Sequence, residues 1–408
     1  MIDHRRWARK ISVGVAVVTA TAFGLTACSG SSTDGAVRTV QVDHQHDEFA
    51  GTFMGYYPRI VTVRPGDTVR FRQTWTGEPH TVTMGTYVQK LVNPIIGIID
   101  KGPPYPSEPP PEAMDFDTKL PGMFPHDDSN GVNQNAAQPC FLDTGSFPDD
   151  PKTPCPKRAQ PEFNGRQSIY SSGFIPYLGA GGNTFEVKLA KDASPGNYFY
   201  YCNIHGPLMS GHIVVAPKGT SIPSQGSLDR QGRKEIEATA KPLLAQYNKE
   251  KAGQGAFKGN LAGSGGDEQT FTGGSVDEFT PRTIKSKVGE KVTWTFVGGH
   301  TVSFNVPKYF PLFSLQRDGN VVANPAAGDA VRWPTPPKLS SRGDPSGHGP
   351  PPPPIHIDAG SFDGSGGLHS SGGDFTTGDT FSVTFTKAGT FLYACLIHPA
   401  MIAKVVVQ

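Results

Sequence analysis

The sequence predicts an all-β protein made of two tandem β-sandwiches or barrels, with a short helical linker and long Pro- and Gly-rich insertions. Three observations lead to this prediction. First, 49 Gly and 38 Pro among 408 residues favour many turns. Second, short alternating apolar runs bounded by Gly and Pro are typical of β-strands. Third, five sequence blocks recur in the same order in the two halves of the chain.

The repeat is visible block by block. Residues 59–71, RIVTVRPGDTVRF, align with residues 282–294, RTIKSKVGEKVTW, and each block has strand character interrupted by a turn. The other matches, in chain order, are 78–83 with 298–303, 169–173 with 368–372, 184–189 with 380–385, and 196–215 with 389–407. Such a series is hard to obtain by chance, so we expect both copies to share one fold.

The repeat also predicts how the chain is divided. We expect a signal peptide at 1–27, a flexible tether at 28–38, one domain at 39–217, a linker with a helix at 218–258, and a second domain at 259–408.

A helix is expected in the linker, over residues 229–251. Apolar residues recur there at i, i+4, i+7, i+8 and i+11, which gathers them on one face: Ile236, Ala240, Leu243, Leu244 and Tyr247. Pro242 should kink or split this helix. We expect its apolar face to serve packing, including packing between the domains.

The N-terminus predicts export. Residues 1–10 are basic, residues 11–27 are apolar and small, and Cys28 follows, which is the pattern of a signal peptide. Residues 25–28, Leu-Thr-Ala-Cys, resemble a bacterial lipobox, which implies cleavage before Cys28 and a lipid on its thiol. The chain would then be membrane-anchored on the outer face of the membrane, in the cell envelope. An uncleaved anchor or a soluble secreted form is the alternative.

Net charge, the Pro-rich insertions and two loop cysteines give further information on the class of protein. A formal net charge of +1 gives no support to a nucleic-acid binder. The insertions contain Pro-rich runs at 101–112 and 346–356, which favour extended segments. In an exported protein, Cys140 and Cys155 are expected to form a disulfide, worth about 3 kcal/mol for such a loop. Two free thiols are the alternative.

Two further cysteines lie in matching contexts that offer metal ligands. Each copy has a Cys, a His and a Met in one loop, and another His far upstream: His80, Cys202, His205 and Met209, then His300, Cys395, His398 and Met401. Thiolate and thioether donors select Cu(I), imidazole suits copper, and trigonal His₂Cys with a weak axial Met is the blue-copper geometry. A structural zinc site would normally use Cys or His where Met stands. A lone Cys or Met is more commonly core filling, but the recurrence of all four residue types favours a metal site.

At these residues both copies resemble cupredoxins of the plastocyanin and amicyanin type. The loop from Cys395 to Met401 has the amicyanin spacing, and the loop from Cys202 to Met209 is one residue longer. The resemblance implies an antiparallel Greek-key sandwich, a type 1 (blue) copper ion on each set of four ligands, and one-electron transfer. Asn commonly follows the upstream His in the family. Thr81 and Thr301 stand here instead, so a brace on the ligand loop is either missing or made by a hydroxyl.

We therefore expect an exported copper protein that transfers electrons and is not an enzyme. Its partners would be redox proteins or copper donors and acceptors. Copper storage, delivery or sensing outside the cytoplasm is the alternative, because the same ligands would serve. The insertions are foreign to small cupredoxins and are candidates for covering the ligand-histidine edge through which electrons usually pass.

A copper oxidase or a nitrite reductase-like enzyme is a third class. A resemblance to such oxidases would imply a trinuclear copper centre. Its ligands would come from paired His-x-His motifs and from histidines beside the Cys. Here the cysteines are flanked by other residues: Tyr201, Asn203, Ala394 and Leu396. Only His44 and His46 form a His-x-His motif. We expect these two to be solvated surface histidines, with an accessory metal site as the alternative.

Overall fold

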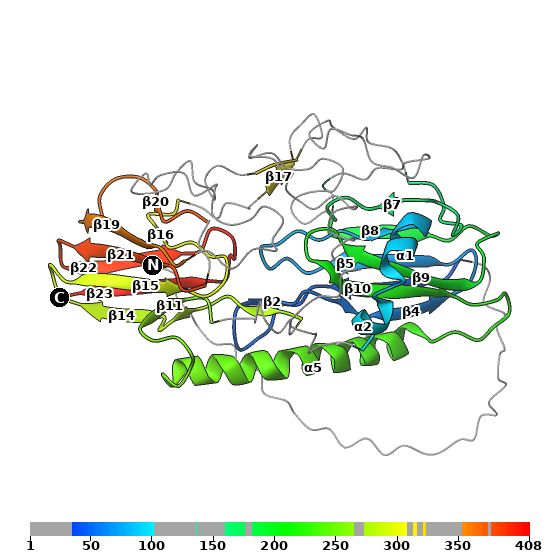
Figure 1. The fold of residues 1–408 in the computed structure, drawn as a ribbon, viewed down its shortest axis with the longest axis horizontal. Helices are drawn as coiled ribbons and strands as arrows, with labels where there is room; N and C mark the ends of the chain where they lie inside the picture. Colours follow the sequence, from blue (N-terminus) through cyan, green and yellow to red (C-terminus); the bar gives the residue numbers. More distant parts are fainter. Residues whose placement is uncertain are drawn as a thin grey trace, which may run out of the picture. The chain divides into compact units, whose positions relative to one another are not determined.

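The computed structural model describes residues 35–101, 137, 160–175, 182–264, 273–307, 313–315, 321–323, 353–373 and 377–408. The fold is all-β, as predicted, with two β-sandwiches (Figure 1). The N-terminal strands are β1 (Val37–Val42), β2 (Gly51–Thr52), β3 (Tyr56–Tyr57), β4 (Ile60–Val63), β5 (Thr68–Gln73), β6 (Thr83–Met84), β7 (Tyr170–Ser171), β8 (Thr184–Lys188), β9 (Gly196–Cys202) and β10 (Gly206–Val215).

The C-terminal strands repeat this series. They are β11 (Asn260–Ala262), β12 (Ser275–Val276), β13 (Phe279–Thr280), β14 (Thr283–Ser286), β15 (Lys291–Phe296), β16 (Ser303–Phe304), β17 (Phe313–Leu315), β18 (Val321–Ala323), β19 (His356–Phe362), β20 (His369–Ser370), β21 (Thr380–Phe385), β22 (Gly389–Ala394) and β23 (Ile402–Val407).

In the N-terminal sandwich, the sheet β3-β1-β5-β8 packs on the sheet β4-β10-β9-β6-β7. Alternate side chains of both sheets point into one core, for example Val40 and Phe71 from the first sheet and Val61, Tyr200 and Ile213 from the second. This is the period-2 burial expected of a half-buried strand.

The C-terminal sandwich has the same arrangement. The sheet β13-β11-β15-β21-β19 packs on β14-β23-β22-β16-β20 around Trp294, Phe304, Phe381 and Tyr393. Apart from β19, each strand of these two sheets has a counterpart in the N-terminal sandwich. The sequence repeat is therefore a repeat of strand order.

The turn that begins each copy has the expected form. Gly66 and Gly289 adopt positive φ angles of 90° and 84°, which glycine adopts without strain. The following acidic residue closes each turn: Asp67 accepts the backbone N–H of Arg64, and Glu290 accepts that of Lys287. After this turn the chain enters the opposite sheet.

The sheets are mixed, whereas the family resemblance implied antiparallel ones. β1 runs parallel to β5, and β4 runs parallel to β10; β11–β15 and β14–β23 repeat these pairs. Because the chain changes sheet between β4 and β5, the first and last strands of each copy enter their sheets parallel to a neighbour.

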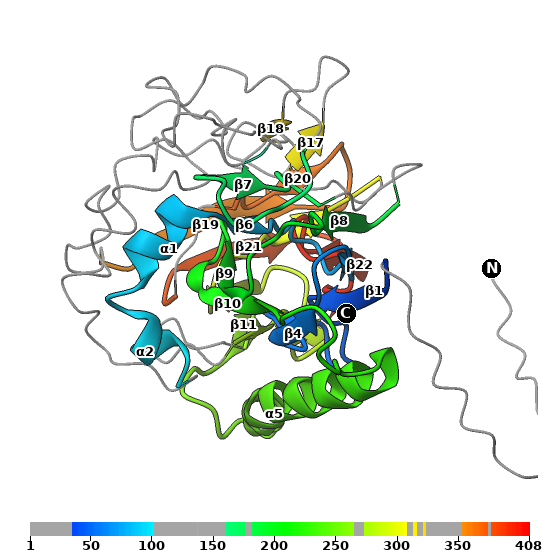
Figure 2. The same cartoon turned by 90° about the vertical axis from the view of Figure 1, so that its right-hand side faces the viewer.

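Two short helices were not expected from the sequence. They are α1 (Thr86–Val92) and α2 (Ile96–Ile99), and they lie against the face of β9 and β10 (Figure 2). Their buried residues follow helical spacing and pack on Phe199 and Tyr201: Val88, Val92, Ile95 and Ile99. Both aromatic side chains point away from the sandwich core, and the helices bury them.

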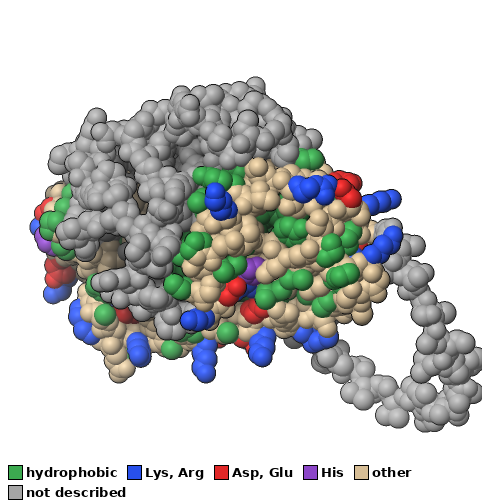
Figure 3. Space-filling view, turned by 45° about the vertical axis from the view of Figure 1, so that its right-hand side comes forward, with side chains coloured by type: hydrophobic (Ala, Val, Ile, Leu, Met, Phe, Trp, Pro, Cys, Tyr) green, Lys and Arg blue, Asp and Glu red, His purple; other side chains and the backbone are tan. Residues whose placement is uncertain are grey.

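The predicted linker helix is α5 (Gln225–Lys251), longer than expected at its N-terminus, where the Ser224 hydroxyl accepts the N–H of Ser227. It is continuous through Pro242, which lies on the exposed side, where water can replace the lost backbone bond. The predicted apolar face is confirmed: Ala240, Leu243 and Tyr247 are buried, with Ile236 and Leu244 packed beside them. Basic side chains project along the edge where α5 lies (Figure 3).

A short strand pair joins the two copies directly. β2 pairs antiparallel with β12, with Thr52 opposite Ser275 and Gly51 opposite Val276. The Thr52 hydroxyl also donates to Asp277, 2.9 Å away. Leu243 of α5 contacts the same region, because Val276, Phe49 and Phe53 share its core cluster. The joint between the copies is thus built from backbone pairing, a buried polar contact and an apolar cluster.

Several expectations lie outside the described residues. These are the signal peptide, Cys28 and its lipid, the disulfide between Cys140 and Cys155, and most of the two Pro-rich runs, residues 102–112 and 346–352. Within the described residues, no helix has the length and apolarity needed to cross a membrane.

We predict that Leu243→Ala lowers the free energy of unfolding by about 2–5 kcal/mol, because it leaves a cavity between α5 and the β2–β12 pair. The exposed control Lys241→Ala should change it by no more than about 0.5 kcal/mol. Urea unfolding followed by tryptophan fluorescence measures both. Equal stability of the two variants would contradict this packing.

Candidate metal centres

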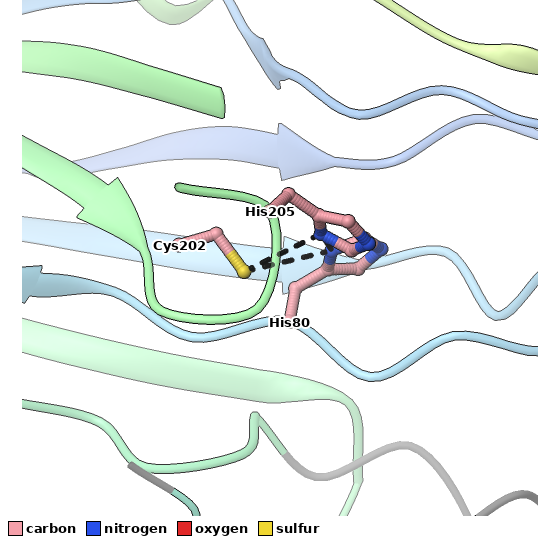
Figure 4. Close-up of side chains that lie close together, drawn as sticks. All are labelled: His80, Cys202 and His205. Atoms are coloured by element: carbon pink, nitrogen blue, oxygen red, sulfur yellow. Dashed lines mark hydrogen bonds between the residues drawn. The ribbon is translucent and has the colours of Figure 1, made fainter. Parts of the chain in front are cut away.

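The first centre brings together three side chains from distant parts of the chain. Cys202 ends β9, His205 lies in the turn before β10, and His80 precedes β6. The Nδ1 atoms of His80 and His205 are 3.2 Å apart, and they lie 4.0 and 3.6 Å from the Cys202 sulfur. Figure 4 shows both rings turning a nitrogen towards the sulfur. Three donor atoms therefore converge on one point.

The second centre repeats this geometry. The Nδ1 atoms of His300 and His398 are 3.1 Å apart, and the sulfur of Cys395 lies 3.8 Å from Nδ1 of His398. In both centres the three donor atoms lie within 4.8 Å of one another. The structure thus gathers six of the eight side chains predicted to bind metal into two matching sets.

The two remaining predicted ligands are methionines, and both are fully buried. Met209 shares the core cluster of Cys202, and Met401 shares that of Cys395. The backbone ties Met401 to its loop: its N–H donates to His398, and its carbonyl accepts from Cys395. In the first copy a register shift between Gly206 and Ser210 accommodates the longer loop that carries Met209.

A hydroxyl braces each ligand loop, one of the two outcomes left open by the sequence. The Thr81 hydroxyl accepts the N–H of Asn203, and the Thr301 hydroxyl accepts that of Leu396, both at 2.8 Å. The backbone N–H of each threonine points to the cysteine sulfur at 3.4 Å. One threonine therefore fixes the loop after the cysteine and also donates to its sulfur.

The repeated Ser-Ser-Gly block supports this threonine from the other side. Ser172 accepts the N–H of Val82 at 2.7 Å, and Ser171 lies 3.0 Å from the Thr83 hydroxyl. Ser371 and Ser370 make the same contacts with residues 302 and 303. The block was recognised in the sequence without a role. Its role is to hold the strand that follows the upstream histidine.

The surroundings favour the ionised form of both cysteines. Burial alone would raise the pKa of Cys202, but the adjacent His205 and His80 lower it well below its ordinary value. The pKa of Cys395 is lowered against burial in the same way, by His300 and His398. Since the thiolate is the form that binds metal, the pocket prepares the ligand it would use.

The outer nitrogens of the upstream histidines have different neighbours. Nε2 of His80 lies 3.0 Å from a carboxylate oxygen of Asp43, and both side chains are fully buried. In the second copy Gly263 holds the place of Asp43 after the first strand. A Cβ on Gly263 would lie 2.5 Å from Nε2 of His300, so no side chain fits there. In the first centre a carboxylate lies behind His80, whereas in the second centre a glycine lies behind His300.

Glu78 connects the two centres, and sequence reasoning gave it no role. One carboxylate oxygen lies 2.6 Å from Nε2 of His205, and the other lies 3.3 Å from Nε2 of His398. Burial would raise the pKa of Glu78, but the bonds to the two histidines lower it well below its ordinary value. The aligned residue of the second copy is Gly298. Glu78 and Pro79 stand opposite Gly298 and Gly299 in a block whose other four residues are identical or similar, and this difference was the signal that the sequence offered.

The ligand-histidine edges face each other across this carboxylate. The side chains of His205 and His398 are only 9% and 5% exposed. The backbones approach closely, because a Cβ on Gly77 would lie 2.1 Å from the carbonyl oxygen of Ile397. Most of the insertions, predicted to cover these edges, lie outside the described residues. Each copy covers the other.

Three other histidines of the first copy lie elsewhere. His46 stacks on Phe49, and His44 packs edge-on to Phe53, so the pair covers aromatic rings rather than projecting into solvent. His212 bonds Asp100, at the C-terminus of α2, at 2.8 Å. Within the described residues, neither arrangement belongs to a metal-binding group.

The donor set fits copper. Each centre offers two imidazole nitrogens and a thiolate, with a buried thioether in the same core, and this combination of soft and intermediate donors is the one that copper prefers. His80, Cys202, His205 and Met209 would hold one ion, and the matching residues of the second copy would hold the other.

Comparison with known proteins gives similarities to solved structures only. No family model and no curated protein matches the chain. Similar structures include the Cu(I) form of a Met-to-Gln mutant of amicyanin (18% identity, 32% of this chain, 73% of that chain, TM-score 0.17). An oxidized Pro-to-Ala mutant of amicyanin is 19% identical, over 32% of this chain and 73% of that chain, with a TM-score of 0.17. A purple cupredoxin from Nitrosopumilus maritimus is 17% identical, over 32% of this chain and 83% of that chain, with a TM-score of 0.14.

We predict that Thr81→Val lowers the free energy of unfolding of the metal-free protein by about 1–3 kcal/mol, because the buried N–H of Asn203 loses its acceptor. Thr81→Ser keeps the hydroxyl and is the matched control. Urea unfolding measures both variants. If Val is tolerated as well as Ser, the hydroxyl does not brace the loop.

Proposed function

We propose that this chain binds two copper ions in separate type 1 centres and transfers single electrons. The observation that carries the proposal is the recurrence of one His–Cys–His set, with a buried Met, at equivalent positions of two sandwiches. Bound copper would supply a one-electron couple between Cu(I) and Cu(II).

The protein's part is to keep the ligands in place in both oxidation states. The cysteines end central strands, the threonine hydroxyls fix the loops after them, and the serine pair holds the strand of the upstream histidine. Ligands fixed by the fold move little when the charge of the ion changes, which is what fast electron transfer requires.

Copper storage, delivery or sensing is the second candidate. The observation that favours it is the low exposure of His205 and His398, which hinders a redox partner from docking at that edge. An oxidase is not proposed, because Tyr201, Asn203, Ala394 and Leu396 flank the cysteines where a trinuclear centre would need histidines.

We also propose where the chain works. The lipobox-like sequence at residues 25–28 supports a lipid anchor on Cys28 and a position on the outer face of the membrane. The proposed partners are redox proteins, or copper donors and acceptors, in the cell envelope.

We predict that copper loading of the mature protein gives two ions per chain, with an intense thiolate-to-copper band and a narrow-hyperfine EPR signal. Cys202→Ser and Cys395→Ser should each remove one ion and its signal, because an alcohol cannot replace the thiolate. His44→Ala is the control and should leave both ions in place. Elemental analysis that finds zinc, or no metal, at these cysteines contradicts the proposal.

A second experiment separates electron transfer from copper handling. Stopped-flow mixing with a one-electron reductant should bleach the visible band reversibly, without loss of copper to a Cu(I) chelator. A colourless protein that gives up Cu(I) readily would instead support storage or delivery.

A further inference from the structure

Glu78 connects the two centres directly in the described structure. Its two carboxylate oxygens each face a different histidine: Nε2 of His205 at 2.6 Å and Nε2 of His398 at 3.3 Å. In both rings Nδ1 is turned towards the cysteine sulfur, so Nε2 is the nitrogen left to bond the carboxylate. One side chain therefore touches a metal-ligand ring of each centre.

The surroundings hold this bridge in place. The β2–β12 strand pair and the bond from Thr52 to Asp277 join the two copies beside it. Gly77, next to Glu78, packs against the backbone of residue 397, next to His398, at a distance that admits no side chain. Asp277 adds a second carboxylate 3.7 Å from Nε2 of His398. The contact is part of the folded joint and not a chance meeting of two surfaces.

The two centres differ in ways that affect their reduction potentials. His80 bonds the buried carboxylate of Asp43, whereas His300 faces Gly263. A carboxylate behind a ligating imidazole makes it a stronger donor and favours the higher oxidation state. Cys395 receives backbone N–H bonds from Thr301 and Ile397, whereas the described residues give Cys202 one, from Thr81. Such bonds withdraw charge from the sulfur and favour the lower oxidation state.

We propose that the Glu78 carboxylate couples the two centres into an internal relay, in which one electron passes from the first centre to the second through His205, Glu78 and His398. The inference rests on the proposed function, since it requires copper in both centres. The step balances within the chain: the first centre is oxidised from Cu(I) to Cu(II), and the second is reduced from Cu(II) to Cu(I). No bond breaks, and no proton leaves the carboxylate.

Glu78 acts as a positioning residue in this relay. It fixes the two imidazoles at the ends of a path made of two hydrogen bonds and one carboxyl group. Asp43 lies 3.0 Å from Nε2 of His80, closer than the 3.7 Å between Asp277 and Nε2 of His398, and only Cys395 receives a second N–H bond among the described residues. This asymmetry gives the path its direction, because it places the electron on the second centre at rest.

The relay is tested by pulse radiolysis of the copper-loaded full chain at sub-stoichiometric reduction. We expect a first-order redistribution of the electron, independent of protein concentration, followed by the visible bands and by rapid-freeze EPR. Glu78→Gln keeps the shape but accepts from only one histidine, so it should slow this phase roughly 10- to 100-fold. Glu237→Gln, an exposed charge change on α5, should leave it unchanged.

The outcomes separate the two proposals. If copper does not bind, the proposed function fails. If both centres bind copper and are reduced normally, yet Glu78→Gln exchanges electrons as fast as Glu237→Gln, the relay is wrong. Copper content and the EPR spectrum of Glu78→Gln show whether its centres are intact.

The direction has its own test, an EPR-monitored redox titration of the copper-loaded chain. We expect the electron to favour the second centre at least about tenfold, or about 59 mV for one electron. Asp43→Asn should reduce this preference, and the exposed Asp47→Asn on the same segment should not. Equal potentials, or a preference for the first centre, would overturn the direction.

Discussion

The constraint on which this structure depends is the burial of a thiol against two imidazoles in the core of each sandwich. A buried thiolate is costly unless charge and hydrogen bonds compensate for it. Here the adjacent histidines lower the pKa of Cys202 and Cys395, and a threonine N–H points to each sulfur. The threonine and serine hydroxyls then fix the loops and strands that deliver these groups. Contacts between protein groups therefore assemble each pocket.

Duplication explains why this assembly occurs twice, and the differences between the copies explain how the two become one unit. Around the pockets the threonine and serine hydrogen bonds match residue by residue. Outside them the copies diverge: Asp43 corresponds to Gly263, and Glu78 corresponds to Gly298. A single carboxylate suffices to meet both ligand histidines, because Gly77, the residue before it, lets the backbones of the two copies approach closely. The edge that an isolated domain would offer to partners is thereby used within the chain.

Much of this could be predicted from the sequence. The repeat predicted two copies of one β fold, and the His, Cys and Met spacing predicted the side chains that converge, because these depend on local patterns. The helices α1 and α2 were overlooked although Val88, Val92, Ile95 and Ile99 follow helical spacing. The mixed sheets and the bridge through Glu78 depend on how distant segments meet. Neither propensity nor spacing within one segment contains that information, and only the mismatch between Glu78 and Gly298 hinted at it.

The account is tested most directly by a crystal structure of the copper-loaded chain, with anomalous diffraction collected on both sides of the copper absorption edge. It predicts two separate copper peaks, each bonded to one cysteine sulfur and to Nδ1 of two histidines, with the Glu78 carboxylate between the outer rings and bound to neither ion. A peak ligated by Glu78 or by the Nε2 atoms, or no peak beside Cys202 and Cys395, would contradict it.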